Sequence, residues 1–169
     1  MEHTVGFLKT CIHERALWHS ATLEASVKKC IKVLCKHKKK FTAIAVRGYS
    51  AAIFGGIVAA RMKKNIVLVR KPKEDEYRHS DRFVEGISNQ SCVFIDDLIS
   101  SGETVKKVVE GLRELKCTLY GVYLYNYYDD TICIQYTLNN IGNQYGTKIL
   151  ALGRDYTPTY TEGEFLPNV

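Results

Sequence analysis

The chain of 169 residues contains no long apolar run and no cysteines at the spacing of a metal site. No segment approaches the roughly 18 apolar residues of a membrane-spanning helix, and the first residues, MEHT, lack the basic and apolar regions of a signal peptide. The six cysteines show no CxxC spacing and do not pair with histidines as zinc ligands do. We therefore expect reduced thiols and a cytoplasmic protein.

The sequence also has no internal repeat, low-complexity stretch or interdomain linker. Its length suits one domain with one core, so we predict a single domain over 1–169, with its core at about 22–153 and a tail at 154–169. The net charge of +6 suits an anionic substrate, and it also suits nucleic acid. Composition does not separate these two partners. The basic run at 36–40 lies at the C-terminal end of a predicted helix, where the helix dipole favours cations, so we expect neither nucleic acid nor a membrane as a partner.

Short apolar runs alternate with helical patterns along the chain. The runs predict strands at about 41–46, 65–70, 91–96, 118–126 and 148–152. Helical spacing predicts helices at about 22–38 and 103–116, and the small residues of 51–61 permit another. Residues 131–141 fit a helix that stops at Gly142, although their β-branched content also fits a strand. The alternation predicts an α/β fold, a doubly wound, mostly parallel sheet of about five strands.

The segment Ser91–Val109 contains the clearest chemical pattern. A buried strand ends in two adjacent acids, Asp96 and Asp97, and the polar turn SSGET at 100–104 leads into a helix. Backbone amides in such a turn bind a phosphate dianion, and Gly102 has no Cβ to block the anion. The carboxylates can accept hydrogen bonds from vicinal sugar hydroxyls or hold a hard cation such as Mg²⁺. The segment therefore predicts a site for a phosphorylated sugar.

Two other predicted strands end in cationic residues. The first is followed by Arg47-Gly48 and the second by Arg70-Lys71. Because the carboxyl ends of parallel strands meet at one edge of a sheet, where ligands bind, these cations should lie beside the sugar site. An arginine and an unencumbered glycine amide can hold an anion. The three strand ends together predict anion- and sugar-binding loops that converge on one edge of the sheet.

These motifs resemble those of the type I phosphoribosyltransferases. The run CVFIDDLISSGET resembles the family's motif for phosphoribosyl pyrophosphate (PRPP), with Ser101 where the family most often has threonine. The Arg47-Gly48-Tyr49 loop and the Arg70-Lys71-Pro72 ending are similar to those of the adenine-type enzymes. The resemblance covers about residues 41–116 and implies a type I phosphoribosyltransferase fold with a small hood formed by the N-terminal residues, about 1–21.

The resemblance also implies a reaction and a set of site residues. The 100–104 turn would hold the 5′-phosphate, and Asp96 and Asp97 would hold the ribose hydroxyls directly or through Mg²⁺ and water. Arg47, Gly48 and Lys71 would hold the pyrophosphate, and Asp96, Asp97, Lys71 and Arg47 are the predicted catalytic residues. The full predicted substrate-binding set is Arg47, Gly48, Tyr49, Arg70, Lys71, His79, Asp96, Asp97, Leu98, Ile99, Ser100, Ser101, Gly102, Glu103 and Thr104.

A long polar segment, 73–89, lies between two predicted strands and occupies the place of the family's flexible catalytic loop. Within it, His79 is a candidate pyrophosphate contact or proton donor, and Glu85 loosely matches the family's loop end. These residues fit solvated loop positions equally well. The resemblance further implies a non-proline cis peptide near Arg47-Gly48.

The sequence indicates less about the residues that would bind the acceptor base than about those that would bind PRPP. A purine base is favoured, and Trp18, Tyr49, Leu98 and residues 125–128 are candidates for its pocket. The resemblance implies a nucleoside monophosphate product, nucleotide salvage and a homodimer. The alternative is a PRPP-binding regulatory protein without catalysis, for which only the basic helix ending at Lys40 would serve as a nucleic-acid element.

Overall fold

The computed structural model describes residues 17, 20–71, 83–126 and 131–153. Its centre is a six-stranded sheet with the order β3-β2-β1-β4-β5-β6. The strands are β1 (Ala43–Val46), β2 (Asn65–Val69), β3 (Val84–Gly86), β4 (Ser91–Asp96), β5 (Thr118–Leu124) and β6 (Leu150–Leu152). All neighbours pair in parallel except β2 and β3, which are antiparallel. The predicted α/β fold with a mostly parallel sheet is confirmed.

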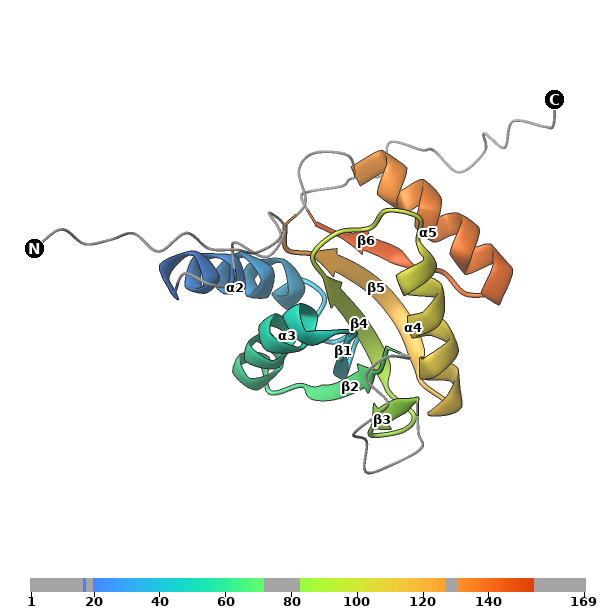
Figure 1. The fold of residues 1–169 in the computed structure, drawn as a ribbon, viewed down its shortest axis with the longest axis horizontal. Coiled ribbons are helices and arrows are strands. Elements are labelled where there is room, and N and C mark those ends of the chain that lie inside the picture. Colours follow the sequence, from blue (N-terminus) through green and yellow to red (C-terminus); the bar gives the residue numbers. More distant parts are fainter. Residues whose placement is uncertain (1–16, 18–19, 72–82, 127–130, 154–169) are drawn as a thin grey trace, which may run out of the picture.

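Helices cover both faces of the sheet (Figure 1). On one face α2 (Ser20–Cys35) and α3 (Tyr49–Met62) pack on side chains such as Ile44, Val93 and Ile95. On the other, α4 (Glu103–Glu114) and α5 (Thr131–Tyr145) pack on the alternate residues of the same strands. Because β1 and β4 are buried on both faces, their sequences are continuous apolar runs. Among the described residues, no helix combines the length and apolarity needed to cross a membrane.

The sheet has six strands, one more than the strands located from the sequence. Strand β3 lies within the segment 73–89, which the sequence analysis assigned to a polar loop. Only Val84 of its three residues is buried, so the strand has almost no apolar signal in the sequence. It forms by pairing Val84, Glu85 and Gly86 with the edge of β2. The polar composition of this segment therefore reflects an edge strand in part, rather than a loop alone.

Residues 131–141 form a helix, as one of the two alternatives held, but Gly142 does not end it. The helix α5 continues to Tyr145, and the chain reverses at Gly146, which has a φ of 63°. A Cβ on Gly142 would lie 2.3 Å from the carbonyl oxygen of Thr147. Gly142 is therefore needed where the chain folds back against the helix, and Gly146 supplies the left-handed residue that follows it.

Candidate functional site

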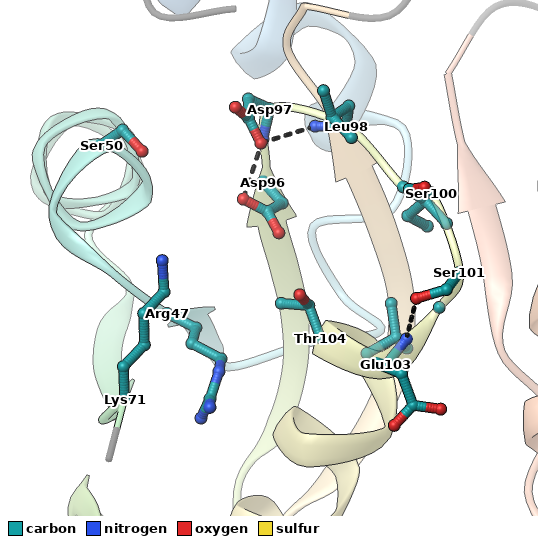
Figure 2. A pocket seen from close by; sticks show the side chains of 13 residues that line it. Arg47, Ser50, Lys71, Asp96, Asp97, Leu98, Ser100, Ser101, Glu103 and Thr104 are labelled. Atoms are coloured by element: carbon teal, nitrogen blue, oxygen red, sulfur yellow. Dashed lines mark hydrogen bonds between the residues drawn. The ribbon is translucent and has the colours of Figure 1, made fainter. Parts of the chain in front are cut away.

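A cavity of about 230 Å³ lies at the carboxyl ends of β1 and β4, between α3 and the start of α4. It is lined from three segments: Arg47 and Ser50 after β1, Lys71 after β2, and the continuous stretch from Asp96 to Val105. Figure 2 shows the cations and the acids on opposite sides of this cavity. The convergence of three strand ends on one edge, predicted from the parallel pattern, is thus the observed geometry.

The acid pair has an ordered geometry set by the backbone that follows β4. The Asp97 amide donates to Asp96 Oδ1 at 3.0 Å, and the Leu98 amide donates to Asp97 Oδ1 at 2.8 Å (Figure 2). The residue that follows β5 also fixes the backbone of this segment, because the Tyr125 amide donates to the Asp96 carbonyl at 3.0 Å. Each carboxylate thus keeps further acceptor sites for a ligand in the cavity.

The turn after the acid pair leads directly into α4. Gly102 is the N-cap residue, with a φ of 81° and a ψ of −2°, and the Ser101 hydroxyl accepts from the Glu103 amide at 3.4 Å. The amides of a helix's first turn have no acceptor within the helix, so they form an anion site. This part of the cavity can hold a phosphate group.

A glycine at position 102 has a structural reason in addition to the predicted one. A Cβ at this position would lie 2.9 Å from Ile141 Cδ1 and 3.1 Å from Thr137 Cγ2, both on α5. The positive φ and the close approach of α5 therefore favour glycine here. The sequence gives no sign of this contact, because α5 is a separate element that follows α4 and β5 along the chain.

The cationic side of the cavity is built from Arg47, Gly48 and Lys71. The Arg47 guanidinium is buried, donates to the Arg70 carbonyl at 2.5 Å and lies 5.4 Å from the centroid of the Phe83 ring. Gly48 has a φ of 82° and a ψ of 167°, a conformation that only glycine adopts readily. A Cβ on Gly48 would lie 2.9 Å from Lys71 Cε and Nζ, so the lysine crosses directly over this glycine.

Most of the predicted site residues line the cavity, but Gly48, Tyr49 and Arg70 do not. Tyr49 is 78% exposed on α3, and Gly48 lies beneath Lys71. Arg70 points to Glu85 on β3 and binds it at 2.6 Å. His79 falls outside the described residues. The prediction of a cis peptide near Arg47-Gly48 is wrong, since the described residues contain none.

Two residues of the cavity wall were missed, and one candidate for the base pocket lies elsewhere. Ser50 and Val105 line the cavity, and Ser50 had a usable signal, a hydroxyl in the first turn after Arg47-Gly48. Tyr125 stacks on Phe54 with 4.3 Å between ring centroids, so it packs against α3. Trp18, Tyr127 and Tyr128 fall outside the described residues.

The surroundings of Asp96 destabilise its charged form. Burial, and after it the charge of Asp97, raises the pKa of Asp96 to about 7, while Lys71 opposes the shift. A sugar hydroxyl or a cation bound between the carboxylates would offset this cost, because either stabilises the charged form. We therefore expect a ligand bound between the two carboxylates to stabilise the folded protein.

Replacing Asp96 by asparagine should stabilise the protein above neutral pH. Since the pKa of the folded state lies above the ordinary value of 3.8, the folded state binds more protons than the unfolded state between about pH 4 and pH 7. The free energy of unfolding should fall as the pH rises through that window. An asparagine side chain cannot ionise, and its oxygen can still accept from the Asp97 amide, so we expect a gain of about 2 kcal/mol near pH 8.

Denaturant unfolding at a series of pH values measures this difference. The gain should shrink as the pH falls towards 4, where the parent Asp96 is protonated in the folded state and becomes protonated in the unfolded state as well. An asparagine variant no more stable than the parent near pH 8 would contradict the assigned burial of this charge.

The acid pair also fits a magnesium ion that is shared with a substrate. Within the described ranges, no group of three or more histidine, cysteine, aspartate or glutamate side chains could form a metal site by itself. Magnesium is commonly bound by one or two carboxylates together with substrate phosphates and water. Asp96 and Asp97 therefore suit an ion that arrives with an anionic substrate, rather than a resident ion.

Comparisons with known proteins agree with this geometry. No family model matches the chain. A curated relative, the adenine phosphoribosyltransferase of Mycoplasmopsis synoviae, is 30% identical over 105 residues, which cover 52% of this chain and 59% of that protein. The chain thus spans little more than half the length of this relative.

Solved structures match over most of the chain. The UMP synthase of Leishmania donovani matches with a TM-score of 0.62 and 23% identity, over 83% of this chain and 29% of that one. The adenine phosphoribosyltransferase of Saccharomyces cerevisiae matches with a TM-score of 0.59 and 14% identity, over 79% and 80%. The orotate phosphoribosyltransferase of Francisella tularensis matches with a TM-score of 0.54 and 14% identity, over 80% and 67%.

The fold is that of the type I phosphoribosyltransferases, with the PRPP-type motif at the expected strand end. The match in sequence to an adenine phosphoribosyltransferase, 30% identity over about half of this chain, is consistent with this fold. The similar proteins include both adenine and orotate enzymes, so the likeness does not distinguish between these acceptor bases.

Proposed function

We propose that this protein transfers the 5-phosphoribosyl group of PRPP to a nucleobase and releases pyrophosphate, in nucleotide salvage. The observation that supports this most is the composition of the cavity at the sheet edge. It combines an acid pair, a phosphate-binding turn and a cationic wall, contributed by three separate strand ends. PRPP carries the matching groups, which are ribose hydroxyls, a 5′-phosphate and a pyrophosphate.

Each part of PRPP has a matching part of the cavity. The first turn of α4, with Ser101 and Thr104, would bind the 5′-phosphate through amides and hydroxyls. Asp96 and Asp97 would accept hydrogen bonds from the ribose hydroxyls. Lys71, lying over Gly48, would meet the pyrophosphate, with Arg47 adding positive charge to the same wall.

In the reaction, a ring nitrogen of the base forms a bond to C1′ as the bond from C1′ to the pyrophosphate oxygen breaks. The leaving pyrophosphate takes the electron pair, and the ring nitrogen releases its proton to water. Lys71 and Arg47 would stabilise the negative charge that develops on the leaving group, because they are held in place before the reaction starts. Asp96 and Asp97 would hold the ribose in position while C1′ carries positive charge.

Magnesium, when bound by Asp96, Asp97 and the substrate oxygens, would neutralise phosphate charge and so favour departure of pyrophosphate. The requirement is testable by removal of the ion. Chelation of Mg²⁺ should abolish pyrophosphate release and leave the free energy of unfolding of the ligand-free protein unchanged.

We propose a purine as the acceptor. The support is the resemblance of the Arg47-Gly48-Tyr49 and Arg70-Lys71 segments to the adenine-type enzymes and the similarity to an adenine phosphoribosyltransferase. Initial rates of pyrophosphate release with adenine, hypoxanthine, guanine, orotate and uracil test this. The highest kcat/KM should belong to a purine, and a higher value for orotate or uracil would contradict the assignment.

The regulatory alternative has a distinct outcome in the same experiment. A non-catalytic PRPP-binding protein would bind PRPP in calorimetry and release no pyrophosphate with any base. We propose a cytoplasmic location for either function, since Cys30, Cys35, Cys92 and Cys117 are thiols, the form that a reducing compartment maintains.

We further propose that the protein forms a homodimer through α3. Tyr49 and Ile53 on this helix are 78% and 45% exposed, which is unusual for large apolar side chains lying one helical turn apart. Replacing Ile53 by glutamate should shift the protein to monomers in sedimentation velocity, because a charge would be buried at the interface. Tyr136→Glu, which alters an exposed residue on α5, is the control. A parent protein that sediments as a monomer would refute the proposal.

A further inference from the structure

The two faces of the sheet differ sharply in charge. Over Ser20–Lys40 and Tyr49–Lys64, which cover both helices of the α2/α3 face, the sequence has ten lysines and arginines and one acid, Glu24. On the opposite face, α4 carries both signs, and Lys106 and Lys107 pair with Glu103 and Glu110. We call the exposed cationic side chains between Lys28 and Lys40, together with Arg61 and Lys63, the basic face.

We propose that the basic face is a binding surface for double-stranded nucleic acid, which it contacts through the phosphate backbone. This function is independent of the reaction proposed above. The positive charge is concentrated on one surface, rather than spread over the molecule, and that arrangement fits a polyanion.

Ordinary structural reasons explain only part of this charge. The helix dipole favours a cation in the last turn of α2, where Lys32 lies. It does not explain Lys38 and Lys39, which lie beyond the end of the helix. The single acid of the region, Glu24, is already bound by Arg61 at 2.7 Å and by Lys28 at 3.5 Å. Like charges held this densely repel one another, so a bound polyanion would stabilise them.

Hydrogen bonds from neighbouring residues fix the 36–40 turn, which carries part of the basic face. Lys64 Nζ donates to the carbonyls of Lys38 and Phe41, at 2.8 and 2.6 Å, and lies 4.6 Å from the centroid of the Phe41 ring. The Ser91 hydroxyl donates to the Lys40 carbonyl at 2.9 Å. These bonds fix the 36–40 turn against the residues that follow α3. The cations of both segments are therefore presented together, with less ordering entropy to lose on binding than in a loose tail.

The side chains of the basic face favour a duplex over a membrane or a single strand. The exposed large apolar residues of the described chain are Tyr49, Ile53, Ile66, Ile87 and Tyr136, and none lies in α2 or in the 36–40 turn, which carry most of the basic face. It therefore offers nothing to insert into a lipid surface. It also offers no exposed aromatic ring on which a single-stranded base could stack. His37 and Tyr120, the nearest aromatic pair, are half-buried and bind each other at 2.9 Å.

The location of the face also permits it to act separately from the cavity. The 36–40 turn precedes β1 and Lys63 precedes β2, whereas the cavity lies at the opposite, carboxyl ends of these strands. Helix α2, visible on the α3 side of the sheet in Figure 1, has 16 residues. At about 1.5 Å per residue it is roughly 24 Å long, which equals about seven base-pair steps of a duplex.

The test is fluorescence anisotropy with a labelled RNA or DNA duplex of about 20 base pairs, at salt concentrations from about 50 to 200 mM. The test variant is Lys32→Gln, Lys38→Gln and Lys39→Gln, which removes three charges from the basic face. The control variant is Lys106→Gln, Lys107→Gln and Lys148→Gln, which removes three charges near α4 and α5. Both variants are checked by thermal unfolding, and binding is repeated with saturating PRPP.

We expect the test variant to bind at least about tenfold more weakly near 100 mM salt, with a salt slope reduced by about one for each lysine that contacts a phosphate. The control variant should stay within about twofold of the parent, and PRPP should not displace the duplex. No duplex binding at the lowest salt, or equal losses in both variants, would overturn the proposal. Displacement by PRPP would overturn it too, by placing the nucleic acid in the cavity. Binding to phosphatidylserine vesicles in place of the duplex would show a membrane surface instead.

Discussion

Replacing Asp96 and Asp97 together by asparagine should weaken PRPP binding by about 100-fold or more. Each carboxylate would lose a charge-assisted hydrogen bond to a ribose hydroxyl, and such bonds contribute roughly 1.5–3 kcal/mol each. The backbone bonds that order the two side chains accept at their Oδ1 atoms, which asparagine retains. The variant therefore removes charge while the shape of the site is kept. Isothermal titration calorimetry with PRPP and Mg²⁺ measures the change.

The control for this variant removes two acids that lie away from the cavity, Glu24→Gln with Glu114→Gln. It should bind PRPP like the parent, which separates the local effect from the change in net charge. The asparagine variant should also be more stable near pH 8, since the buried Asp96 charge is removed. An unchanged affinity for PRPP in the folded asparagine variant would be incompatible with the assigned sugar site.

Replacing Gly48 by alanine should lower kcat/KM by about 100-fold or more, through the position of Lys71. The new Cβ would lie 2.9 Å from Lys71 Cε and Nζ, so the end of the lysine side chain must shift from its present position over Gly48. Loss of one preorganised charge opposite a leaving group costs roughly 10²–10³ in rate. The alanine would also adopt a φ of 82°, which costs a further ~1–3 kcal/mol of stability.

Gly146→Ala is a matched control for the strain. Gly146 also has a positive φ, 63°, and an added Cβ there would meet nothing within 4 Å. It should lose stability, measured by thermal unfolding, and keep its turnover. Lys71→Met tests the charge without strain and should lose turnover while keeping stability. If Gly48→Ala and Gly146→Ala lost activity equally, the proposed role of Lys71 would be wrong.

Much of the fold and one side of the site were predictable from local patterns. The strands β1 and β4 have apolar runs because both of their faces are covered. Their ends carry Arg47 and Asp96, and the parallel order alone brings these residues to one edge. The helix α4 was predictable because Val105, Val108 and Leu112 lie on one buried face.

The features that were missed depend on contacts between distant segments. Strand β3 forms by pairing with β2 and has only Val84 buried, so no local period indicates it. Arg70 appeared to be a pyrophosphate ligand from its place after a strand, yet that same pairing brings Glu85 beside it, and the two side chains bind. The close approach of α5 to Gly102 had no sign in the local sequence either. Local sequence shows the residue type a position requires, but it does not show which distant element imposes the requirement.

The most direct test of the proposed function is the stoichiometry of the products. Purified protein, PRPP, Mg²⁺ and a base are incubated, and pyrophosphate and nucleoside monophosphate are quantified together. We predict that both products accumulate in equal amounts, only when base is present, and that the Asp96→Asn, Asp97→Asn variant forms neither at a comparable rate. Tight binding of PRPP without base-dependent release of pyrophosphate, across all purine and pyrimidine bases, would contradict the assignment of a phosphoribosyltransferase.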